Sequence, residues 1–214
     1  MVIGLGNFGY NAAYALAKAG KEVIAIDSNS GRVEEIGDKV RKAATVDVRN
    51  KKAISELISL NNIDVAIVSL GDNLEASILA IMYLKEMKIE RIIAKASNED
   101  QSNVFHALGV DEVIFPEQEV AQKLALRLVK PNFIDYLPMA EDYGIIEYEV
   151  PAEFVGKTLA ELNLRNKYNI EIIAVKNIMS GNLSMLPRAD YTFEPDMVII
   201  MIGRNEDIEK FKYR

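Results

Sequence analysis

In roughly the first two-thirds of the chain, short apolar runs alternate with stretches of helical periodicity. The apolar runs, each bounded by turn-forming residues, predict strands at Val2–Ile3, Glu22–Ile26, Lys42–Val46, Val65–Leu70, Arg91–Ala96 and Glu112–Phe115. Because Val65–Leu70 is apolar throughout, we expect a parallel strand that is covered on both faces. Strands and helices that alternate with short connections predict an α/β protein with a doubly wound parallel sheet.

The pattern changes after about residue 140. Pro131 and the segment 138–144 interrupt the regular pattern. Beyond them the sequence predicts a small α+β domain with strands at Ile145–Val150, Ile170–Val175 and Met197–Ile202 and helices at Leu159–Leu162 and Ile208–Phe211. We therefore expect an α/β domain over 1–130, a linker over 131–142 and an α+β domain over 143–214.

Two helices are more hydrophobic than one buried face requires. Residues 78–84 are apolar on every side of the predicted helix. In 118–129, Val120, Leu124 and Leu128 form a stripe, and Val129 falls outside it. A sheet covers one face of such a helix, so we predict that a second chain covers the other. Burial under the second domain is the alternative.

Composition and charge narrow the classes of protein. The chain has 214 residues, of which 50% are hydrophobic, and a net charge of −7. With 0 Cys it can form no disulfide or thiolate metal site. No apolar run approaches the roughly 20 residues of a membrane-spanning helix, and the N-terminus does not resemble a secretion signal. Since basic residues are not clustered, nucleic acid is not an expected partner. A cytoplasmic location is expected.

A glycine-rich turn lies between the first strand and the first helix, roughly Tyr10–Ala19. Its sequence is Gly4-Leu5-Gly6-Asn7-Phe8-Gly9. In the G-x-G-x-x-G pattern the first Gly makes a tight turn, the second lets the backbone approach a phosphate and the third lets helix pack on strand. A helix N-terminus also favours an anion. The turn therefore predicts a Rossmann-like nucleotide site, although such turns also occur for packing alone.

Polar side chains follow several of the predicted strands. Asp27, at the end of the second strand, is placed to bind ribose hydroxyls and to repel a 2′-phosphate, which disfavours NADP; otherwise it caps a turn. Asp47 is placed to accept from an adenine amino group, or is an ordinary turn residue. Ser69-Leu70-Gly71-Asp72-Asn73 follows the fourth strand, where the strand order of such a sheet reverses and ligands bind. The alternative is a plain helix cap, formed by Asp72 or Asn73.

Two further charged residues are weaker candidates. Lys95, at the end of the fifth strand, is able to reach a phosphate or is a solvated side chain, and Glu117 is equally ambiguous. His106 is the only histidine, and we interpret it as structural.

Catalytic chemistry is poorly supported. A dehydrogenase needs a proton-handling group beside the hydride acceptor. The second domain has no His or Cys and no evident pair of carboxylates, and the chain lacks the G-x-x-x-x-G-K-[ST] motif of NTP hydrolysis. We expect binding without catalysis. A small NAD-dependent oxidoreductase is the alternative, and a nucleotide-sensing module of a transporter or channel is a third interpretation.

The whole chain resembles a known family, the cytosolic regulatory subunits of Trk/Ktr-type potassium uptake systems. These subunits consist of an N-terminal domain that regulates K⁺ conductance (RCK) and a small C-terminal companion. The resemblance rests on the glycine turn, Val68–Ser77, Ala94-Lys95-Ala96, Gly109-Val110-Asp111, Phe115-Pro116-Glu117, Val155–Leu159, Leu162, Leu164, Pro187 and Pro195-Asp196.

The resemblance implies a nucleotide-gated ring of eight domains, peripheral to the inner face of the cell membrane, on a membrane-embedded K⁺ transporter or channel subunit. It implies domain pairing through helices after the fourth to sixth strands. It also implies adenine-nucleotide ligands, and Glu117 would be a cation or inter-subunit contact. Together, the motifs and the resemblance give these candidate binding residues, with no catalytic residue and no metal ligand: Gly4, Gly6, Asn7, Phe8, Gly9, Asp27, Ser28, Asp47, Val48, Ser69, Leu70, Gly71, Lys95 and Glu117.

One departure from the family pattern concerns the ligand. Many ATP-responsive members have Arg where this chain has Asn7. An Asn side chain can donate a hydrogen bond but cannot neutralise a γ-phosphate. We therefore expect AMP, ADP or NAD(H) to be favoured over ATP.

Overall fold

The computed structural model describes residues 1–129 and 133–212. The chain divides into two compact units, Met1–Glu117 and Gln118–Arg214, and each is described by itself. The predicted fold class, a Rossmann-like parallel sheet followed by a small α+β domain, is confirmed.

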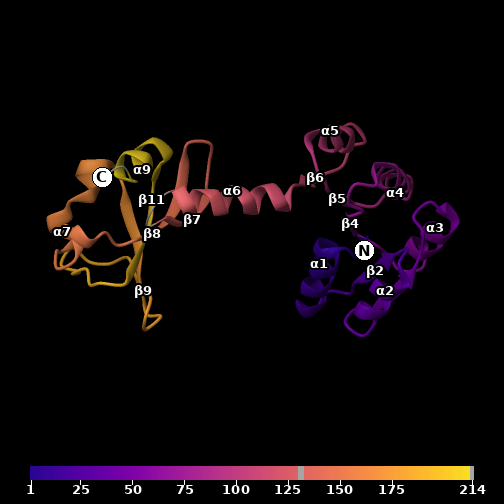
Figure 1. Cartoon of the computed structure of the whole chain (residues 1–214), viewed down its shortest axis with the longest axis horizontal. Coiled ribbons are helices and arrows are strands. Elements are labelled where there is room, and N and C mark those ends of the chain that lie inside the picture. The colour runs from indigo at the N-terminus through magenta and orange to yellow at the C-terminus, as the bar shows by residue number, and fades with distance from the viewer. Residues whose placement is uncertain (130–132, 213–214) are drawn as a thin grey trace. The chain divides into compact units, whose positions relative to one another are not determined.

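The first unit alternates strands and helices as the hydrophobic pattern predicts (Figure 1). Its strands pair in parallel in the order β3-β2-β1-β4-β5-β6. The elements are β1 Val2–Ile3, α1 Asn7–Lys18, β2 Ile24–Asp27, α2 Ser30–Gly37, β3 Lys42–Thr45, α3 Lys51–Ser59, β4 Val65–Val68, α4 Leu74–Glu86, β5 Arg91–Lys95, α5 Glu99–Ala107 and β6 Glu112–Ile114. The strand order reverses between β1 and β4, so the carboxyl ends of these strands diverge there and leave room for a ligand.

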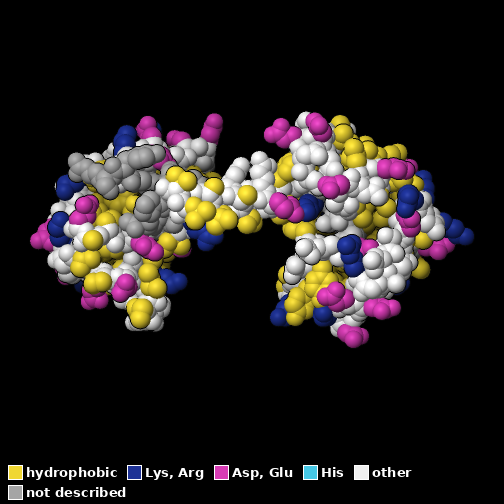
Figure 2. All heavy atoms as spheres, viewed as in Figure 1, with side chains coloured by type: hydrophobic (Ala, Val, Ile, Leu, Met, Phe, Trp, Pro, Cys, Tyr) yellow, Lys and Arg dark blue, Asp and Glu magenta, His cyan; other side chains and the backbone are white. Residues whose placement is uncertain are grey.

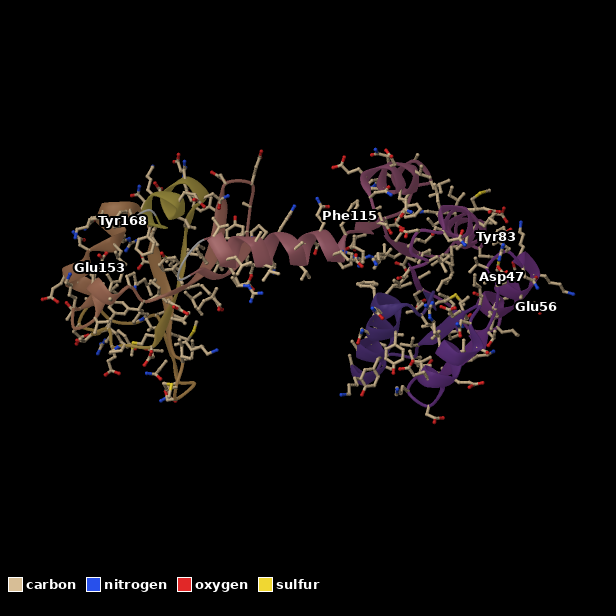
Figure 3. The ribbon with its side chains drawn as sticks, in the orientation of Figure 1. Asp47, Glu56, Tyr83, Phe115, Glu153 and Tyr168 are labelled. Atoms are coloured by element: carbon tan, nitrogen blue, oxygen red, sulfur yellow. The ribbon has the colours of Figure 1, made fainter. Side chains whose placement is uncertain are left out.

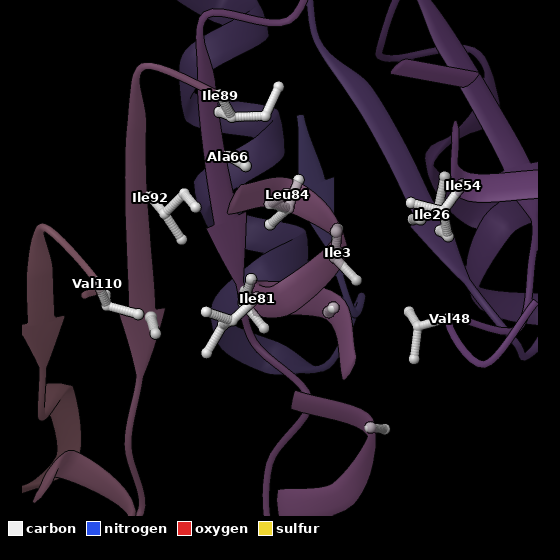
Figure 4. Close-up of a cluster of buried hydrophobic side chains, with 14 of the residues drawn as sticks. Ile3, Ile26, Val48, Ile54, Ala66, Ile81, Leu84, Ile89, Ile92 and Val110 are labelled. Carbon is white, nitrogen blue, oxygen red and sulfur yellow. The ribbon is translucent and has the colours of Figure 1, made fainter. Parts of the chain in front are cut away.

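Two apolar clusters cover the two faces of this sheet. On one face, Ile81 and Leu84 of α4 pack over Ile3 and Ile92, together with residues of α3 and α5 (Figure 4). On the other face, α1 and α2 pack against β1 and β2 around the fully buried Ala13. Each helix therefore contributes its predicted apolar stripe to a core.

The expectation that both faces of β4 are covered is wrong within this unit. Val65 is 40% exposed, and Ile67 and Ile93 are only partly buried. These side chains lie on the face of the sheet that α1 and α2 cover. The two helices pack on β1, β2 and β3, and of β4 they contact only Ile67. After β6 the chain enters α6, Pro116–Val129, which belongs almost entirely to the second unit. Within the first unit, no helix therefore covers the face of β4 and β5 that lies opposite α4.

The apolar helix 78–84 is covered more fully by its own unit than its sequence suggests. It forms α4, which packs on the sheet and lies between α3 and α5. Ala80, Ile81 and Leu84 are buried, whereas Met82 is 42% exposed. The unit therefore buries one side of this helix, while Ile78, Leu79 and Tyr83 are only partly buried beside Met82.

The second unit is built on an antiparallel sheet with the order β10-β9-β11-β8-β7. Besides α6 it contains β7 Phe133–Pro138, β8 Tyr143–Glu149, the short 3₁₀ helix η1 Ala152–Phe154, α7 Leu159–Leu162, α8 Leu164–Tyr168, β9 Glu171–Asn177, β10 Leu183–Met185, β11 Met197–Arg204 and α9 Asn205–Lys212. Phe154, Phe193 and Phe211 form the aromatic centre of its core.

The predicted linker over 131–142 differs from the structure. Residues 130–132 lie outside the described residues, but 133–138 form β7, which pairs with β8 at the edge of the second sheet. Pro138 ends β7 at a position where an edge strand needs no donor. Most of the predicted linker is thus part of the second unit.

Candidate functional site

A cavity of about 340 Å³ opens at the carboxyl ends of β1 to β4. Because the strands are parallel, the turns that follow them meet at this one edge of the sheet. The lining residues are Gly4, Gly6, Ile26, Asp27, Ser28, Arg32, Val46, Asp47, Val48, Arg49, Ser69, Leu70, Gly71, Asn73 and Ala76.

The glycine turn adopts a conformation that other residues cannot. Gly4 has φ +91°, and a Cβ there would overlap the backbone carbonyl of Ser69. At Gly9 a Cβ would overlap the carbonyl oxygen of Gly4, so α1 can approach β1 only with glycine. At Gly6 a Cβ would meet nothing within 4 Å. The fold itself does not require glycine at position 6, but the residue lines the cavity, where a small side chain keeps the backbone accessible.

Asp27 fixes this turn to the end of β2. Its Oδ2 accepts from the backbone N–H of Leu5 at 2.6 Å, and its Oδ1 accepts from that of Asn29 at 2.8 Å. The residue is only 7% exposed, and Arg32 approaches Oδ2 at 3.5 Å. A buried carboxylate with two charge-assisted hydrogen bonds holds the glycine turn in place while it faces the cavity.

An ion pair forms the cavity wall beyond β3. Nε and Nη2 of Arg49 donate to the carboxylate of Asp47 at 3.0 Å and 2.9 Å, and the Arg49 backbone N–H donates at 2.9 Å. These hydrogen bonds lower the pKa of the Asp47 carboxyl. Asp47, labelled in Figure 3, is therefore charged and engaged by Arg49.

The opposite wall is the turn from β4 into α4. Gly71 has φ +62°, and Asn73 caps α4 by accepting from the N–H of Ala76 at 3.1 Å. This turn brings Ser69 and Leu70 to the cavity. Asn73 therefore caps the helix, as one prediction has it, while Ser69, Leu70 and Gly71 lie at the predicted reversal of strand order and line the cavity.

The predicted residues fall into two groups. Those that line the cavity are Gly4, Gly6, Asp27, Ser28, Asp47, Val48, Ser69, Leu70 and Gly71. The others, which are not among its lining residues, are Asn7, Phe8, Gly9, Lys95 and Glu117.

The last two of these form an ion pair of their own. Lys95, which is only 14% exposed, donates to the carboxylate of Glu117 across the turn between β6 and α6. This hydrogen bond lowers the pKa of the Glu117 carboxyl. This ion pair links the end of β5 to the start of α6, and neither residue lines the cavity described above.

Sequence reasoning missed some of the lining residues. Arg32 and Arg49 carry the positive charge of the cavity, and the others are Ile26, Val46 and Ala76. Both arginines follow a strand-end aspartate within five residues. That spacing is a local signal that could have found them.

Two observations bear on other kinds of site. Over the described ranges 1–129 and 133–212, no group of three or more His, Asp or Glu side chains is arranged to hold a metal ion. Over those same ranges no helix is both long and apolar enough to cross a membrane.

Family models match both parts of the chain. A TrkA-N domain model matches residues 1–116, and a TrkA-C domain model matches residues 145–213.

Individual relatives and a solved structure agree with these matches. The chain is 33% identical to the Ktr system potassium uptake protein C of Bacillus subtilis over 100% of its own length and 95% of the relative's. It is 31% identical to the Ktr system potassium uptake protein A of the same organism, over 99% and 94%. The fold is similar to that of the GsuK channel bound to NAD, with a TM-score of 0.52 and 22% identity over 98% of this chain and 37% of that one.

The glycine turn, the strand order and the small antiparallel unit therefore coincide with the two domain models and with relatives that match nearly end to end. The chain belongs to the family of proteins built from a TrkA-N domain followed by a TrkA-C domain.

Proposed function

We propose that this protein is a nucleotide-sensing regulatory subunit of a potassium uptake system. The observation that carries the proposal is the cavity of about 340 Å³ formed by the glycine turn and Asp27. It occurs in a chain that matches Ktr potassium uptake proteins over nearly their full length. The GsuK channel, whose structure was solved bound to NAD, shares the fold.

The cavity suits a nucleotide that extends from β1 toward β3. Free backbone N–H groups in the first turn of α1, whose N-cap Gly6 makes no side-chain capping bond, would bind the phosphate. Asp27 would accept from the ribose hydroxyls with its remaining lone pairs. The base would lie against Val46 and Val48 at the β3 end.

The charge distribution supports AMP, ADP or NAD(H) over ATP. The two lining cations, Arg32 and Arg49, come from α2 and from the segment after β3 rather than from the glycine turn. Asn7 brings no charge to the phosphate end, and Lys95 is engaged by Glu117. A third phosphate would therefore gain little compensation for its charge.

Assembly into a ring on a membrane K⁺ transport subunit is part of the proposal. The open face of β4 and β5 exposes Val65, and the outer side of α4 exposes Met82. On α6, Val120, Leu124, Leu128 and Val129 are exposed, and hydrophobic atoms lie open along this helix (Figure 2). Exposed apolar surfaces of this kind mark protein–protein contacts. We propose dimers that assemble into an eight-domain ring in the cytoplasm, at the inner face of the membrane.

The regulatory mechanism would be linkage rather than catalysis. A nucleotide shifts the ring only if it binds one arrangement more tightly than another. The lining residues include no His, Lys or Tyr, and the carboxylates of Asp27 and Asp47 are engaged by hydrogen bonds within the protein, so the cavity is better suited to binding than to hydride transfer. The oxidoreductase alternative is not favoured.

Calorimetric titration of the intact protein with AMP, ADP, ATP and NAD tests the proposal. We expect binding, with ATP weaker than the tightest of the other three. Gly6→Ala should weaken binding at least about tenfold, because its Cβ enters the cavity and not the core. The melting temperature should fall only slightly, because alanine is a poorer N-cap of α1 than glycine.

Gly37→Ala is the matched control. Gly37 is exposed at the end of α2, where a Cβ would also meet nothing within 4 Å, and it lies outside the cavity. Absence of binding by all four nucleotides at millimolar concentration would overturn the proposed function, and tightest binding of ATP would overturn the preference alone.

A further inference from the structure

The β3 end of the cavity contains a side chain whose geometry suits recognition of a flat base. Arg49 donates to Asp47 through two guanidinium nitrogens, Nε and Nη2, at 3.0 Å and 2.9 Å. This two-point contact fixes the plane of the guanidinium, which a single contact does not. Arg32, the other cation of the cavity, reaches Asp27 only through one nitrogen at 3.5 Å and is not held in this way.

Asp47 has little capacity left for a ligand. Its Oδ1 accepts from the backbone N–H of Arg49 at 2.9 Å and from Nε at 3.0 Å, and its Oδ2 accepts from Nη2 at 2.9 Å and from Nε at 3.2 Å. A carboxylate oxygen has about two lone pairs for hydrogen bonding. The expected bond from an adenine amino group to Asp47 would therefore compete with the Arg49 contacts.

Arg49 itself has an open surface. Its side chain is 60% exposed, although one edge of the guanidinium is occupied by Asp47. The hydrogen bond to Asp47 raises the pKa of Arg49, with a smaller contribution from the charge of Glu75 in the first turn of α4. Arg49 is therefore charged and lies at the mouth of the cavity, near both the end of β3 and the start of α4.

We infer that Arg49 binds the base of the nucleotide by stacking its guanidinium plane on the ring, and that Asp47 is a positioning residue that acts through Arg49. The inference rests on the proposed nucleotide site. Stacking tolerates any aromatic ring because every base has a π face. A stacked base accordingly meets little discrimination at its exocyclic groups, which for a purine nucleotide includes the group at C6.

Calorimetric titration of AMP and IMP, which differ at C6, separates stacking from hydrogen bonding. Arg49→Ala should weaken both nucleotides by a similar factor, about 5- to 10-fold. Arg49→Lys should weaken binding almost as much as Arg49→Ala, since an ammonium group has the charge but not the flat surface of a guanidinium. Asp47→Asn should weaken both nucleotides by a smaller common factor, leaving the ratio of their dissociation constants unchanged. The double variant should be no weaker than Arg49→Ala.

Arg91→Ala is the matched control. Arg91 and Glu112 form an exposed ion pair in the same unit, with side chains 57% and 44% exposed against 60% and 45% for Arg49 and Asp47. Arg91 does not line the cavity, and its replacement should leave both affinities unchanged.

The outcomes separate the inference from the proposed function. If the intact protein binds none of AMP, IMP, ADP, ATP and NAD, the proposed function fails and the inference fails with it. If it binds but Arg49→Ala behaves like the intact protein, only the inference fails. A change in the AMP-to-IMP ratio in Asp47→Asn would show that Asp47 contacts the base directly, which also overturns the inference.

Discussion

At the residue scale, Asp27 combines a structural role with its proposed ribose contact. Its carboxylate is the acceptor for the N–H groups of Leu5 and Asn29, and it is 7% exposed. Asp27→Ala leaves these donors without their partner, so we expect the free energy of unfolding to fall by about 1–3 kcal/mol. Urea unfolding followed by circular dichroism measures it. Asp47→Ala, at an exposed pair, should leave the midpoint unchanged, and an equal effect of both variants would contradict the assignment.

The third glycine of the turn gives a second prediction. Alanine is intrinsically the better helix former, so Gly9→Ala within α1 should stabilise the protein if propensity decided the outcome. The Cβ would instead overlap the carbonyl oxygen of Gly4, and we expect a loss of about 1–3 kcal/mol from overpacking. Gly37→Ala, in open space at the end of α2, should be neutral or mildly stabilising. Thermal unfolding of both variants distinguishes the two effects by sign.

Residues at the strand ends were accessible to sequence reasoning, whereas those between them were not. The end of a buried parallel strand is visible as the end of an apolar run, and this rule placed Asp27, Asp47 and Ser69 at one edge. Arg49 belongs to a turn without periodicity, and its contact with Asp47 depends on backbone torsions that the pattern does not encode. The sequence could therefore indicate which strand ends form the cavity, but not that Arg49 forms hydrogen bonds with Asp47.

At the scale of elements, α6 is the helix whose surroundings the sequence could not specify. A hydrophobic stripe predicts that a helix packs, but not on what. In α6, the side chains of Val120, Leu124 and Leu128 are exposed. The strand β7 was missed for a different reason. Pro131 and Pro138 suggested a break, yet an edge strand tolerates proline at its end.

The exposed stripe of α6 leads to a prediction about assembly. Leu124 is 46% exposed and Leu128 is 77% exposed. If they are buried between copies of the chain, Leu124→Glu/Leu128→Glu places two charges in that contact and should lower the assembly mass measured by light scattering. Gln118→Glu/Gln122→Glu adds the same charges with the same spacing, centred roughly 120° away around the helix, and should not. An unchanged mass in the leucine variant would exclude this stripe from the interface.

At the scale of the whole molecule, each unit has its own hydrophobic core. Phe105 is fully buried in the first core, and Phe193 is 1% exposed in the second. The proposed site lies entirely within the first unit. A ligand that binds only the folded first unit stabilises that unit by about 2.7 kcal/mol at a concentration 100 times its dissociation constant. The effect on the second unit depends on how strongly the two are coupled.

Hydrogen exchange of the intact protein with and without saturating AMP measures that coupling. We expect slower exchange in the turns after β1 to β4 and little change in β8, β9 and β11, because these three strands belong to a separate hydrophobic core and contribute no residue to the cavity lining. Phe105→Ala should speed exchange in the first unit and Phe193→Ala in the second, since each loses about 3–5 kcal/mol of local packing. Protection of the second sheet by AMP in the assembled protein, and not in the disassembled α6 variant, would place the transmission at the contacts between copies; protection in both would place it within one chain.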